Sequence, residues 1–528
     1  MTPELPYPSQ RQPVMGRAMV ATSQPLAAQA GLSMLARGGS AADAAVAAAM
    51  VLTVVEPTGN GIGSDAFALV HDGQALHGLN ASGRAPATWT PERFAGQEAM
   101  PTRGWDAVTV PGAVSGWIAL WRRFGTLPLD EIAAPAIRYA EEGHPLAPLI
   151  ARQWRSGAEI LQDQPGFAAC FMPGGRTPEA GEWVRLPDHG ATLRRIADTE
   201  GAAFYEGDLA EAMVAHAQAN GGAMTRDDLA AHRADWVAPV SQRFGDHVIH
   251  EIPPSGQGIT ALMALGMLEG LDLPDHPDDP AQMHLAIEAV KLAMADARAH
   301  VADIAAMRWA PEALLDPAYL ASRAALIDSA RAGDPQAGAP TEGGTVYLSV
   351  ADENGMMVSF IQSNYMGFGS GVVVPGTGIS MQNRGAGFTL EPGHPNEVGP
   401  GKRPFHTIIP AFATDAETGA PRMAFGVMGG LMQAQGHVQM ALRVLRAGQN
   451  PQAAADAPRW RCMGGKKVAV EAGFDPALAE ALRALGHEIT VETLDAMFGF
   501  GGAQLILKGA QGYIGGSDPR KDGQAVAF

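Results

Sequence analysis

Residues 343–363 (GGTVYLSVADENGMMVSFIQS) constrain what this 528-residue chain can fold into more than any other stretch. Apolar and polar residues alternate over 345–350 and again over 357–363, which is the period of a half-buried β-strand. The DENG residues between the two runs favour a turn, because Asn and Gly tolerate positive φ. The sequence therefore predicts a β-hairpin whose first strand begins at a threonine.

That threonine, Thr345, is a candidate nucleophile. The glycines before it leave the backbone free to distort, and a distorted peptide bond before a hydroxyl residue is a place where an acyl shift can cut the chain. Cleavage between Gly344 and Thr345 would give Thr345 a free α-amine. Such an amine titrates at about 7.7–8.0, so near neutrality part of it can accept the hydroxyl proton. Gly-Gly-Thr also precedes strands that have no such chemistry.

Several other motifs accompany the hairpin in a definite order. They are 19–57 (MVATSQPLAAQAGLSMLARGGSAADAAVAAAMVLTVVEP), 368–388 (FGSGVVVPGTGISMQNRGAGF), 398–410 (VGPGKRPFHTIIP) and 515–525 (GGSDPRKDGQA). Together with the hairpin they resemble the γ-glutamyltranspeptidase family of N-terminal-nucleophile hydrolases. The resemblance implies an α+β fold, a four-layer αββα sandwich with two central antiparallel sheets.

The same resemblance implies how the chain is divided. A precursor would cut itself before Thr345 into a large subunit, 1–344, and a small subunit, 345–528, which fold together as one sandwich and stay associated. A homodimer of that pair is left open. Residues 331–344 (RAGDPQAGAPTEGG) have no periodicity and predict an exposed tether that carries the junction.

Further catalytic roles are implied by the resemblance. In the family a hydroxyl residue eighteen positions after the nucleophile hydrogen-bonds it, which gives this role to Ser363; a solvent-facing strand serine is the alternative. Gly429 and Gly430 follow the apolar run 423–428 and match the glycine pair whose backbone N–H groups stabilise the oxyanion. Without the resemblance they would be a turn at the end of a strand.

The expected substrate pocket departs from the family pattern. Ser82 stands where the family has the arginine that binds an α-carboxylate, and Arg84 lies two residues further on. His406 and Thr407 replace two adjacent serines, and Ala386-Gly387 replace the acidic pair that meets the α-amino group. Loss of a fixed cation and a fixed anion would remove charge-assisted bonds that select an amino-acid head group.

These departures favour relatives that cleave other amides, such as oxamate amidohydrolases and cephalosporin acylases, over glutathione turnover. Arg84 and His406 remain candidates to bind a carboxylate, with a surface arginine and a capped loop histidine as the alternatives. Asn364 and Tyr365 are further candidate substrate-binding residues. Together with Met428, Leu431, Met432 and Gln433 they lie near the variant positions in sequence and favour the same relatives.

Composition excludes several partners. A net charge of −18 argues against nucleic acid and anionic membranes, since those need basic surfaces. The longest apolar run, 44–55, is too short to span a bilayer, and the first residues contain no apolar signal segment, so the sequence predicts a cytoplasmic protein. Length alone would allow two to four domains, and Cys170 and Cys462 could form at most one bridge.

Neither a metal nor a cofactor is predicted. The sequence contains no G-x-S-x-G elbow, P-loop, HExxH motif or paired-cysteine metal spacing. Residues 256–261 (GQGITA) resemble a dinucleotide fingerprint only weakly, because two prolines intervene after the preceding strand. A nucleotide-dependent oxidoreductase is therefore a remote alternative.

Local patterns predict several helices. Ser23 is expected to cap a helix that ends at 38–39, and Ser40 with Asp43 forms a capping-box pattern before helix 41–52. Residues 284–301 predict an amphipathic helix with Glu288 and Lys291 on its polar side.

The sequence thus predicts a self-processing amidohydrolase or acyltransferase that cleaves a small-molecule amide through a Thr345 acyl-enzyme, with hydrolysis favoured over transfer. One alternative is a true γ-glutamyl or glutathione hydrolase-transferase. Another is an unprocessed homologue that acts only as a binding or scaffold protein, because Gly344 and Val346 differ from the residues that commonly flank the family's nucleophile.

Overall fold

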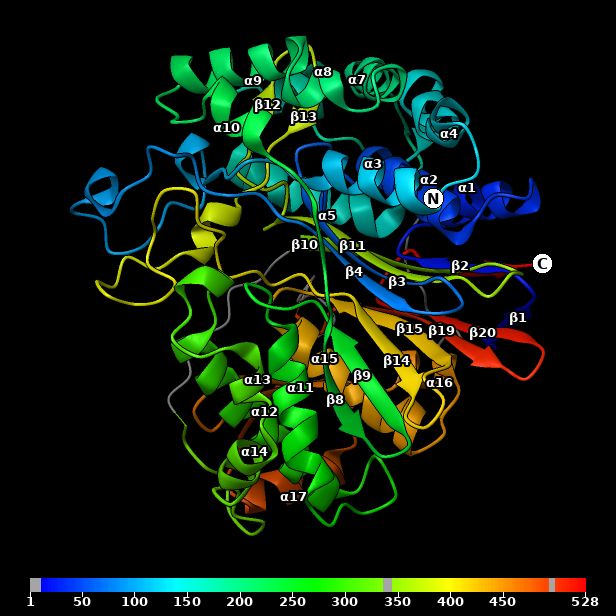
Figure 1. Cartoon of the computed structure of the whole chain (residues 1–528), viewed down its shortest axis with the longest axis vertical. Helices are drawn as coiled ribbons and strands as arrows, with labels where there is room; N and C mark the ends of the chain where they lie inside the picture. Colours follow the sequence, from blue (N-terminus) through cyan, green and yellow to red (C-terminus); the bar gives the residue numbers. More distant parts are fainter. Residues whose placement is uncertain (1–10, 336–343, 493–498) are drawn as a thin grey trace.

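Two antiparallel β-sheets lie face to face in the middle of the molecule, and helices cover the outer face of each (Figure 1). The computed structural model describes residues 11–335, 344–492 and 499–528. Each sheet buries one face against the other sheet and one against helices, which is a stable way to cover two apolar faces. The four-layer αββα sandwich implied by the resemblance is confirmed.

Both sheets combine strands from before and after Thr345. In the described part of the chain, the first sheet has seven strands in the order β21 (Gln524–Ala527), β2 (Met19–Thr22), β10 (Gly344–Ala351), β11 (Met357–Tyr365), β3 (Asp65–His71), β4 (Leu76–Ala81) and β7 (Asp235–Val237). The second sheet, over the same residues, has the order β1 (Val14–Gly16), β20 (Gly512–Ser517), β19 (Gly502–Gly509), β15 (Pro421–Met428), β14 (Ala411–Asp415), β9 (His247–Glu251) and β8 (Val240–Phe244). Both parts of the sequence therefore contribute to one core.

The two helical layers come from different parts of the chain (Figure 1). The first sheet is covered by helices that include α1 (Pro25–Ala36), α2 (Ala41–Val55), α3 (Ala113–Phe124), α4 (Leu129–Glu142), α5 (Pro148–Leu161), α7 (Pro187–Asp198) and α9 (Asp208–Ala219). The helices of the other layer include α11 (Gly258–Glu269), α12 (Pro280–His300), α14 (Pro317–Ala324), α15 (Met432–Met440), α16 (Pro451–Asp456) and α17 (Pro476–Ala484). A small sheet of β16 (Trp460–Gly464), β17 (Lys467–Glu471) and β18 (Glu488–Glu492) joins the second layer.

The predicted hairpin is confirmed as β10 and β11, which pair antiparallel with Val350 opposite Val358. The expectation of half-buried strands is wrong, because every residue of both strands is buried between α2 and the second sheet. The register shifts between Gly344 and Val346, so Thr345 lies at an irregularity of the β-bulge type. A bulge bends its strand and re-aims a side chain.

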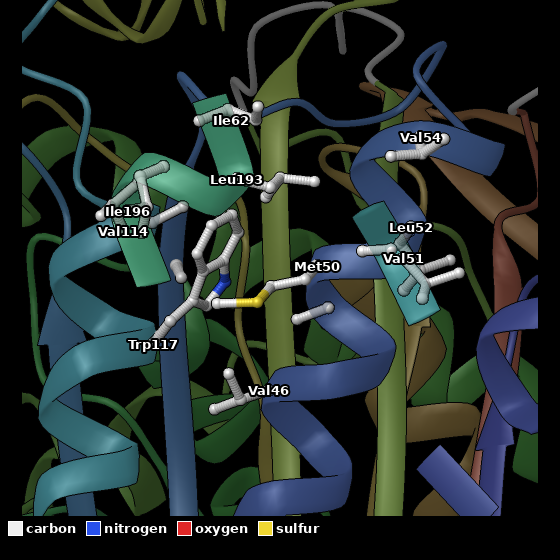
Figure 2. Packing of buried hydrophobic residues seen from close by; sticks show 14 of the residues in the cluster. Val46, Met50, Val51, Leu52, Val54, Ile62, Val114, Trp117, Leu193 and Ile196 are labelled. Atoms are coloured by element: carbon white, nitrogen blue, oxygen red, sulfur yellow. The ribbon is translucent and has the colours of Figure 1, made fainter. Parts of the chain in front are cut away.

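Helix α2 lies at the centre of the largest apolar cluster, and all 15 of its residues are buried. Its predicted capping box of Ser40 and Asp43 is confirmed, and the helix continues to Val55. Figure 2 shows Trp117 of α3 packed beside Met50 of α2. The Trp117 indole N–H donates to Gln362 Oε1 on β11 at 2.9 Å, which ties the helical layer to the hairpin.

Two helix predictions need correction. The side-chain cap of α1 is Gln24, which accepts from the Leu26 N–H, whereas Ser23 Oγ donates to Glu56 Oε2. Glu288 and Lys291 do not form a solvated face of α12: both are buried, and Lys291 Nζ donates to Glu288 Oε1 at 2.8 Å. Helical periodicity alone did not reveal that α17 and residues 328–333 cover this side of α12.

The predicted tether is only partly described, since residues 336–343 lie outside the described part of the chain. Its described beginning is held in place, because Ala332 is buried and its N–H donates to the Leu485 carbonyl oxygen at 2.7 Å. The expected exposure is therefore wrong for Ala332. Cys170 and Cys462 are both free thiols, and none of the described helices is long and apolar enough to cross a membrane.

Replacing Trp117 with alanine should lower the free energy of unfolding by about 3–5 kcal/mol, because a fully buried indole leaves a cavity and an unpaired Gln362 oxygen. Trp183 is 70% exposed and serves as the matched control, for which Trp183→Ala should change stability by less than about 0.5 kcal/mol. Chemical denaturation measures both variants. Equal midpoints would contradict the role of Trp117 in the core.

Candidate active site

Thr345 is enclosed at the start of β10, with 1% of its surface exposed. Its Oγ1 lies 2.8 Å from the Gly344 carbonyl oxygen and 3.2 Å from Ser363 Oγ. Ser363 Oγ in turn donates to the Gly344 carbonyl oxygen at 2.7 Å and accepts from the Tyr365 N–H. A hydroxyl that donates to this oxygen polarises the carbonyl group at the expected cleavage junction.

The glycine-rich turn before β3 allows the main chain to approach this junction. A Cβ atom on Gly59 would lie 3.3 Å from the main-chain N, C and O atoms of Thr345. The Gly59 carbonyl oxygen also accepts from the Asn364 N–H, next to Ser363. A larger residue at this position would press directly on the candidate nucleophile.

Gly429 and Gly430 connect β15 to α15 and both have positive φ (114° and 59°). This left-handed backbone favours glycine, so the pair is required by the chain path as well as by the proposed chemistry. Gln433 in the first turn of α15 places its Nε2 3.4 Å from Thr345 Oγ1, and the Gln433 N–H donates to the Gly430 carbonyl oxygen. The structure therefore brings the glycine pair and the threonine into the same neighbourhood.

Gln257 is a site residue that sequence reasoning missed. Its Nε2 donates to the carbonyl oxygens of Thr407 (2.6 Å) and Gly430 (2.9 Å), which joins two segments of the site. The residue belongs to the stretch that weakly resembled a dinucleotide fingerprint. Strand β9 before it pairs antiparallel with β8 and β14, whereas that fingerprint belongs to a parallel βαβ unit.

The two candidates that follow β4 have other partners. Ser82 is buried, and its Oγ donates to Asn80 Oδ1 at 2.7 Å. The Arg84 guanidinium lies 3.2 Å from Asp303 Oδ2 and 3.1 Å from the Gly401 carbonyl oxygen, and 48% of its side chain is exposed. The structure thus places Arg84 in an ion pair at the protein surface.

Asn364 and Tyr365 lie at the end of β11. The Asn364 amide is engaged within the protein, because it donates to Ser380 Oγ and accepts from Ser64 Oγ. Tyr365 has a positive φ of 78°, and its ring lies under the Arg384 guanidinium at 4.5 Å from ring centroid to Cζ. Asn364 therefore supports the shape of the site, and Tyr365 supports Arg384.

His406 and Thr407 also lie in this buried region. His406 Nε2 is 3.1 Å from Asp65 Oδ2, and burial lowers the pKa of His406 well below its usual value, so the neutral ring donates to the carboxylate. Burial raises the pKa of Asp65 to about 6, against the opposing effect of the nearby Arg384. Thr407 Oγ1 accepts from Arg384 Nη1 at 2.9 Å.

Arg384 is the second site residue that sequence reasoning missed. Its side chain is fully buried, and its Nε and Nη2 have no hydrogen-bond partner among the described residues. Burial lowers its pKa to about 10, so the guanidinium is still charged at neutral pH. The signal was the one charged residue of the glycine-rich 368–388 motif, two residues before the Ala386-Gly387 departure.

A cavity of about 380 Å³ adjoins this region. It is lined by Gln257, Gly387, Phe388, Leu431 and Met294, together with residues of the segment 389–396 and of α12. Gln257 and Leu431 directly connect the cavity to the glycine pair. Its volume is that of a small-molecule site.

One group of side chains elsewhere has the geometry of a metal site. His284, Glu288 and His487 each offer a ligand atom within 4.8 Å of the others. These atoms already have partners: Lys291 Nζ donates to Glu288 Oε1, and His284 Nδ1 lies 2.8 Å from His487 Nε2. The Lys291 side chain thus occupies the position beside the Glu288 carboxylate that a metal ion would take.

The fold and the enclosed threonine at the head of β10 define a class: hydrolases that use an N-terminal nucleophile. A solved cephalosporin acylase from Bacillus halodurans is similar over 100% of this chain and 99% of its own, with a TM-score of 0.95 and 47% identity. The family model "Gamma-glutamyltranspeptidase" matches residues 27–528. The chain therefore belongs to the γ-glutamyltranspeptidase family, as the sequence motifs indicated.

Two relatives are similar to this chain over nearly its whole length. The glutathione hydrolase-like YwrD proenzyme of Bacillus subtilis (strain 168) is 37% identical over 97% of this chain and 98% of its own length. The oxamate amidohydrolase proenzyme of Klebsiella pneumoniae subsp. pneumoniae is 38% identical over 95% and 97% respectively. The prediction that this chain is an amidohydrolase of the N-terminal-nucleophile type is confirmed by these comparisons.

Asp65→Asn should remove a pH dependence of stability. The folded-state pKa of Asp65 is raised to about 6 from 3.8, so the folded protein binds the extra proton between these values and its free energy of unfolding falls as pH rises through them. The cost reaches about 3 kcal/mol above pH 6. Asparagine carries no charge and has no such penalty, so the free energy of unfolding of the variant should rise by that amount relative to the parent between pH 4 and pH 7.

Denaturation at several pH values, with Thr345→Ala in both proteins so that neither is cut, measures this difference. Asp415→Asn is the control: Asp415 is on the surface, and local hydrogen bonds lower its pKa. Curves for Asp65→Asn that run parallel to the parent from pH 4 to 7 would contradict the prediction.

Proposed function

We propose that this chain matures by cutting itself between Gly344 and Thr345, and that Thr345 then hydrolyses a small-molecule amide. The observation that carries this proposal is the position of Thr345 Oγ1 at a strand irregularity, beside the Gly344 carbonyl oxygen that Ser363 already contacts. The division into chains 1–344 and 345–528 follows from it.

Maturation begins with attack of Thr345 Oγ on the carbonyl carbon of Gly344. The negative charge that develops on the Gly344 oxygen is stabilised by the hydroxyl of Ser363, which donates to it. The C–N bond breaks, the nitrogen takes the proton that Thr345 Oγ has lost and becomes the α-amine, and an ester remains on Oγ. Water hydrolyses this ester, leaving a carboxylate on Gly344 and a free hydroxyl on Thr345.

The mature site repeats the chemistry on an external amide. The α-amine of Thr345 accepts the Oγ proton as Oγ attacks the substrate carbonyl carbon, and that proton passes to the leaving amine. The backbone N–H groups of Gly429 and Gly430 stabilise the oxyanion. Water then attacks the Thr345 ester, with the same amine as base, and releases the acid.

The two chains stay together after the cut. Strand β10, which begins at the junction, pairs with β2 from the first chain and with β11 from the second. Strand β11 in turn pairs with β3 of the first chain from Met357 to Ser363. Separation would break these ladders and expose the apolar core, so covalent continuity is not needed.

The substrate we propose is an amide other than glutathione, and water is its acceptor. The family's acidic pair for an α-amino group is replaced by Ala386-Gly387, which line the cavity of about 380 Å³. Relatives named oxamate amidohydrolase and cephalosporin acylase support such a substrate. A glutathione hydrolase remains the second candidate, because the similar YwrD proenzyme is named glutathione hydrolase-like.

Thr345→Ala should abolish both maturation and amide hydrolysis, because it removes the attacking oxygen. A denaturing gel of the wild-type protein should show two bands, and N-terminal sequencing of the smaller should start at Thr345. Thr345→Ser, which keeps a hydroxyl, should still mature. Thr414→Ala is the matched control, since Thr414 is a buried strand threonine that contacts His250 and lies outside the site.

A Thr345→Ala protein that still matures and turns over amides would refute the proposal. A wild-type protein that remains one full-length chain and hydrolyses no amide would instead favour the binding or scaffold alternative.

If the enzyme hydrolyses its acyl-enzyme rather than transferring the acyl group, an added amine acceptor should change the reaction rate little. With a chromogenic anilide as substrate, glycylglycine should raise the rate of aniline release by less than about twofold, because the site lacks the charged pair that would hold an amino-acid head group. Mass spectrometry should find the free acid as the product. Rapid γ-glutamyl transfer to glycylglycine would contradict this prediction and favour the glutathione candidate.

A further inference from the structure

We propose that Arg384 selects the substrate by binding a carboxylate in its acyl part. This inference rests on the proposed amide hydrolysis at Thr345 and adds the chemical class of the acyl group. The residue begins the single helical turn Arg384–Gly387, whose last two residues, Ala386 and Gly387, line the cavity next to Leu431. Its guanidinium is a buried charge for which the described part of the chain supplies no contacting counter-ion.

The Arg384 guanidinium is held on two sides and unpaired on a third. Nη1 donates to Thr407 Oγ1, and the flat face lies over the ring of Tyr365. Nε and Nη2, which share one edge of the guanidinium, have no hydrogen-bond partner among the described residues. Such an edge presents two parallel N–H groups, the arrangement that binds a carboxylate with two hydrogen bonds.

The nearest acid does not use this edge. Asp65 acts on Arg384 through its charge, but Asp65 Oδ2 lies 3.1 Å from His406 Nε2 and Asp65 Oδ1 accepts the Gly83 N–H. A buried charge without a contacting partner is costly. A ligand carboxylate would both satisfy the two free donors and neutralise the guanidinium.

Arg384 is linked to the nucleophile through two short chains of contacts. On one side, the N–H of Tyr365 donates to Ser363 Oγ, which is 3.2 Å from Thr345 Oγ1. On the other, Gln257 connects the Thr407 carbonyl oxygen to that of Gly430. Arg384 therefore lies within a substrate's length of both the attacking oxygen and the proposed oxyanion donors.

The acyl part is assigned to Arg384 because this side of the site is enclosed. The guanidinium is fully buried, whereas the cavity beyond the turn is bordered by exposed residues such as Arg298 and Glu391. The amine has to leave after the first step, so it belongs on the open side. The acyl group stays bound to Thr345 until water arrives and can use the enclosed cation throughout.

Other cations near the site already have partners. Arg84 is paired with Asp303 at the surface. Arg403 Nη2 contacts Asp235 at 2.8 Å, and Arg403 Nε donates to the Ser82 carbonyl oxygen. His406 is neutral at physiological pH because burial lowers its pKa. The geometry therefore favours Arg384 over Arg84 and His406, the two carboxylate-binding candidates of the sequence.

The test compares matched anilides that share one leaving group. The charged members are the p-nitroanilides of oxalic, succinic and glutaric acids, coupled through one carboxyl group, and the neutral members are their methyl esters. Wild-type protein should hydrolyse at least one charged member with a kcat/KM about 10²-fold above that of its ester, the effect of two charge-assisted hydrogen bonds. Equal values for every pair would overturn the proposal and leave amide hydrolysis standing.

Arg384→Gln should abolish that preference, mainly through a higher KM for the charged members. Arg384→Lys keeps the positive charge but lacks the two parallel N–H groups of the guanidinium, so it should retain an intermediate preference. Arg122→Gln, which removes an exposed arginine paired with Glu200, should behave as wild type. Loss of the preference in Arg84→Gln, with Arg384→Gln unaffected, would overturn the assignment to Arg384.

A second measurement does not depend on turnover or maturation. Calorimetric titration of uncut Thr345→Ala protein with glutarate, succinate and oxamate should detect binding of at least one of them. The same titration of the double variant Thr345→Ala/Arg384→Gln should not. Binding that is unchanged by Arg384→Gln, or absent from the parent protein, would refute the carboxylate site whether or not the chain is an amidohydrolase.

Discussion

The pairing of β10 with β11 is the interaction on which the candidate site depends. It brings Ser363 beside Thr345 across the hairpin, and the register shift near Gly344 turns the backbone at the point where the cut is proposed. Strand β2 pairs with β10 only from Leu348 to Ala351, so the first residues of β10 are not paired with β2. Because the rest of β10 is paired with β2 and β11, the strand can keep its position when the bond before Thr345 is broken.

Burial strengthens the electrostatic interactions between the polar groups of the site, and it also raises the free-energy cost of leaving one of them unpaired. In a buried region, charges interact more strongly than in water, and an unpaired one is penalised. Asp65 and His406 pair with each other, with the histidine neutral, whereas two Arg384 donors have no partner among the described residues. Buried charges that a protein retains at such a cost often mark function. Arg384 contacts Thr407, one of the two positions where the family pattern has serines.

Local sequence patterns predicted the local structure well. The alternation in 343–363 identified the hairpin, and the spacing of Ser40 and Asp43 identified the start of α2. The errors came where distant segments cover a surface. The hairpin is buried on both faces because a second sheet packs on it, and Glu288 and Lys291 are buried because other segments cover that side of α12. Periodicity reports that a face is polar but not whether it is solvated.

By itself, the sequence determined the hairpin, the order of the motifs and hence the family, because these depend on residues close together in the chain and on their spacing. Only the tertiary structure decided which polar groups are already paired. His406 meets Asp65 across 341 residues of sequence, and Arg84 meets Asp303 across 219. Among the residues that the structure describes, Arg384 has no such partner on one edge. Pairing is a property of long-range packing, so the selective cation could be found only after the chain was folded.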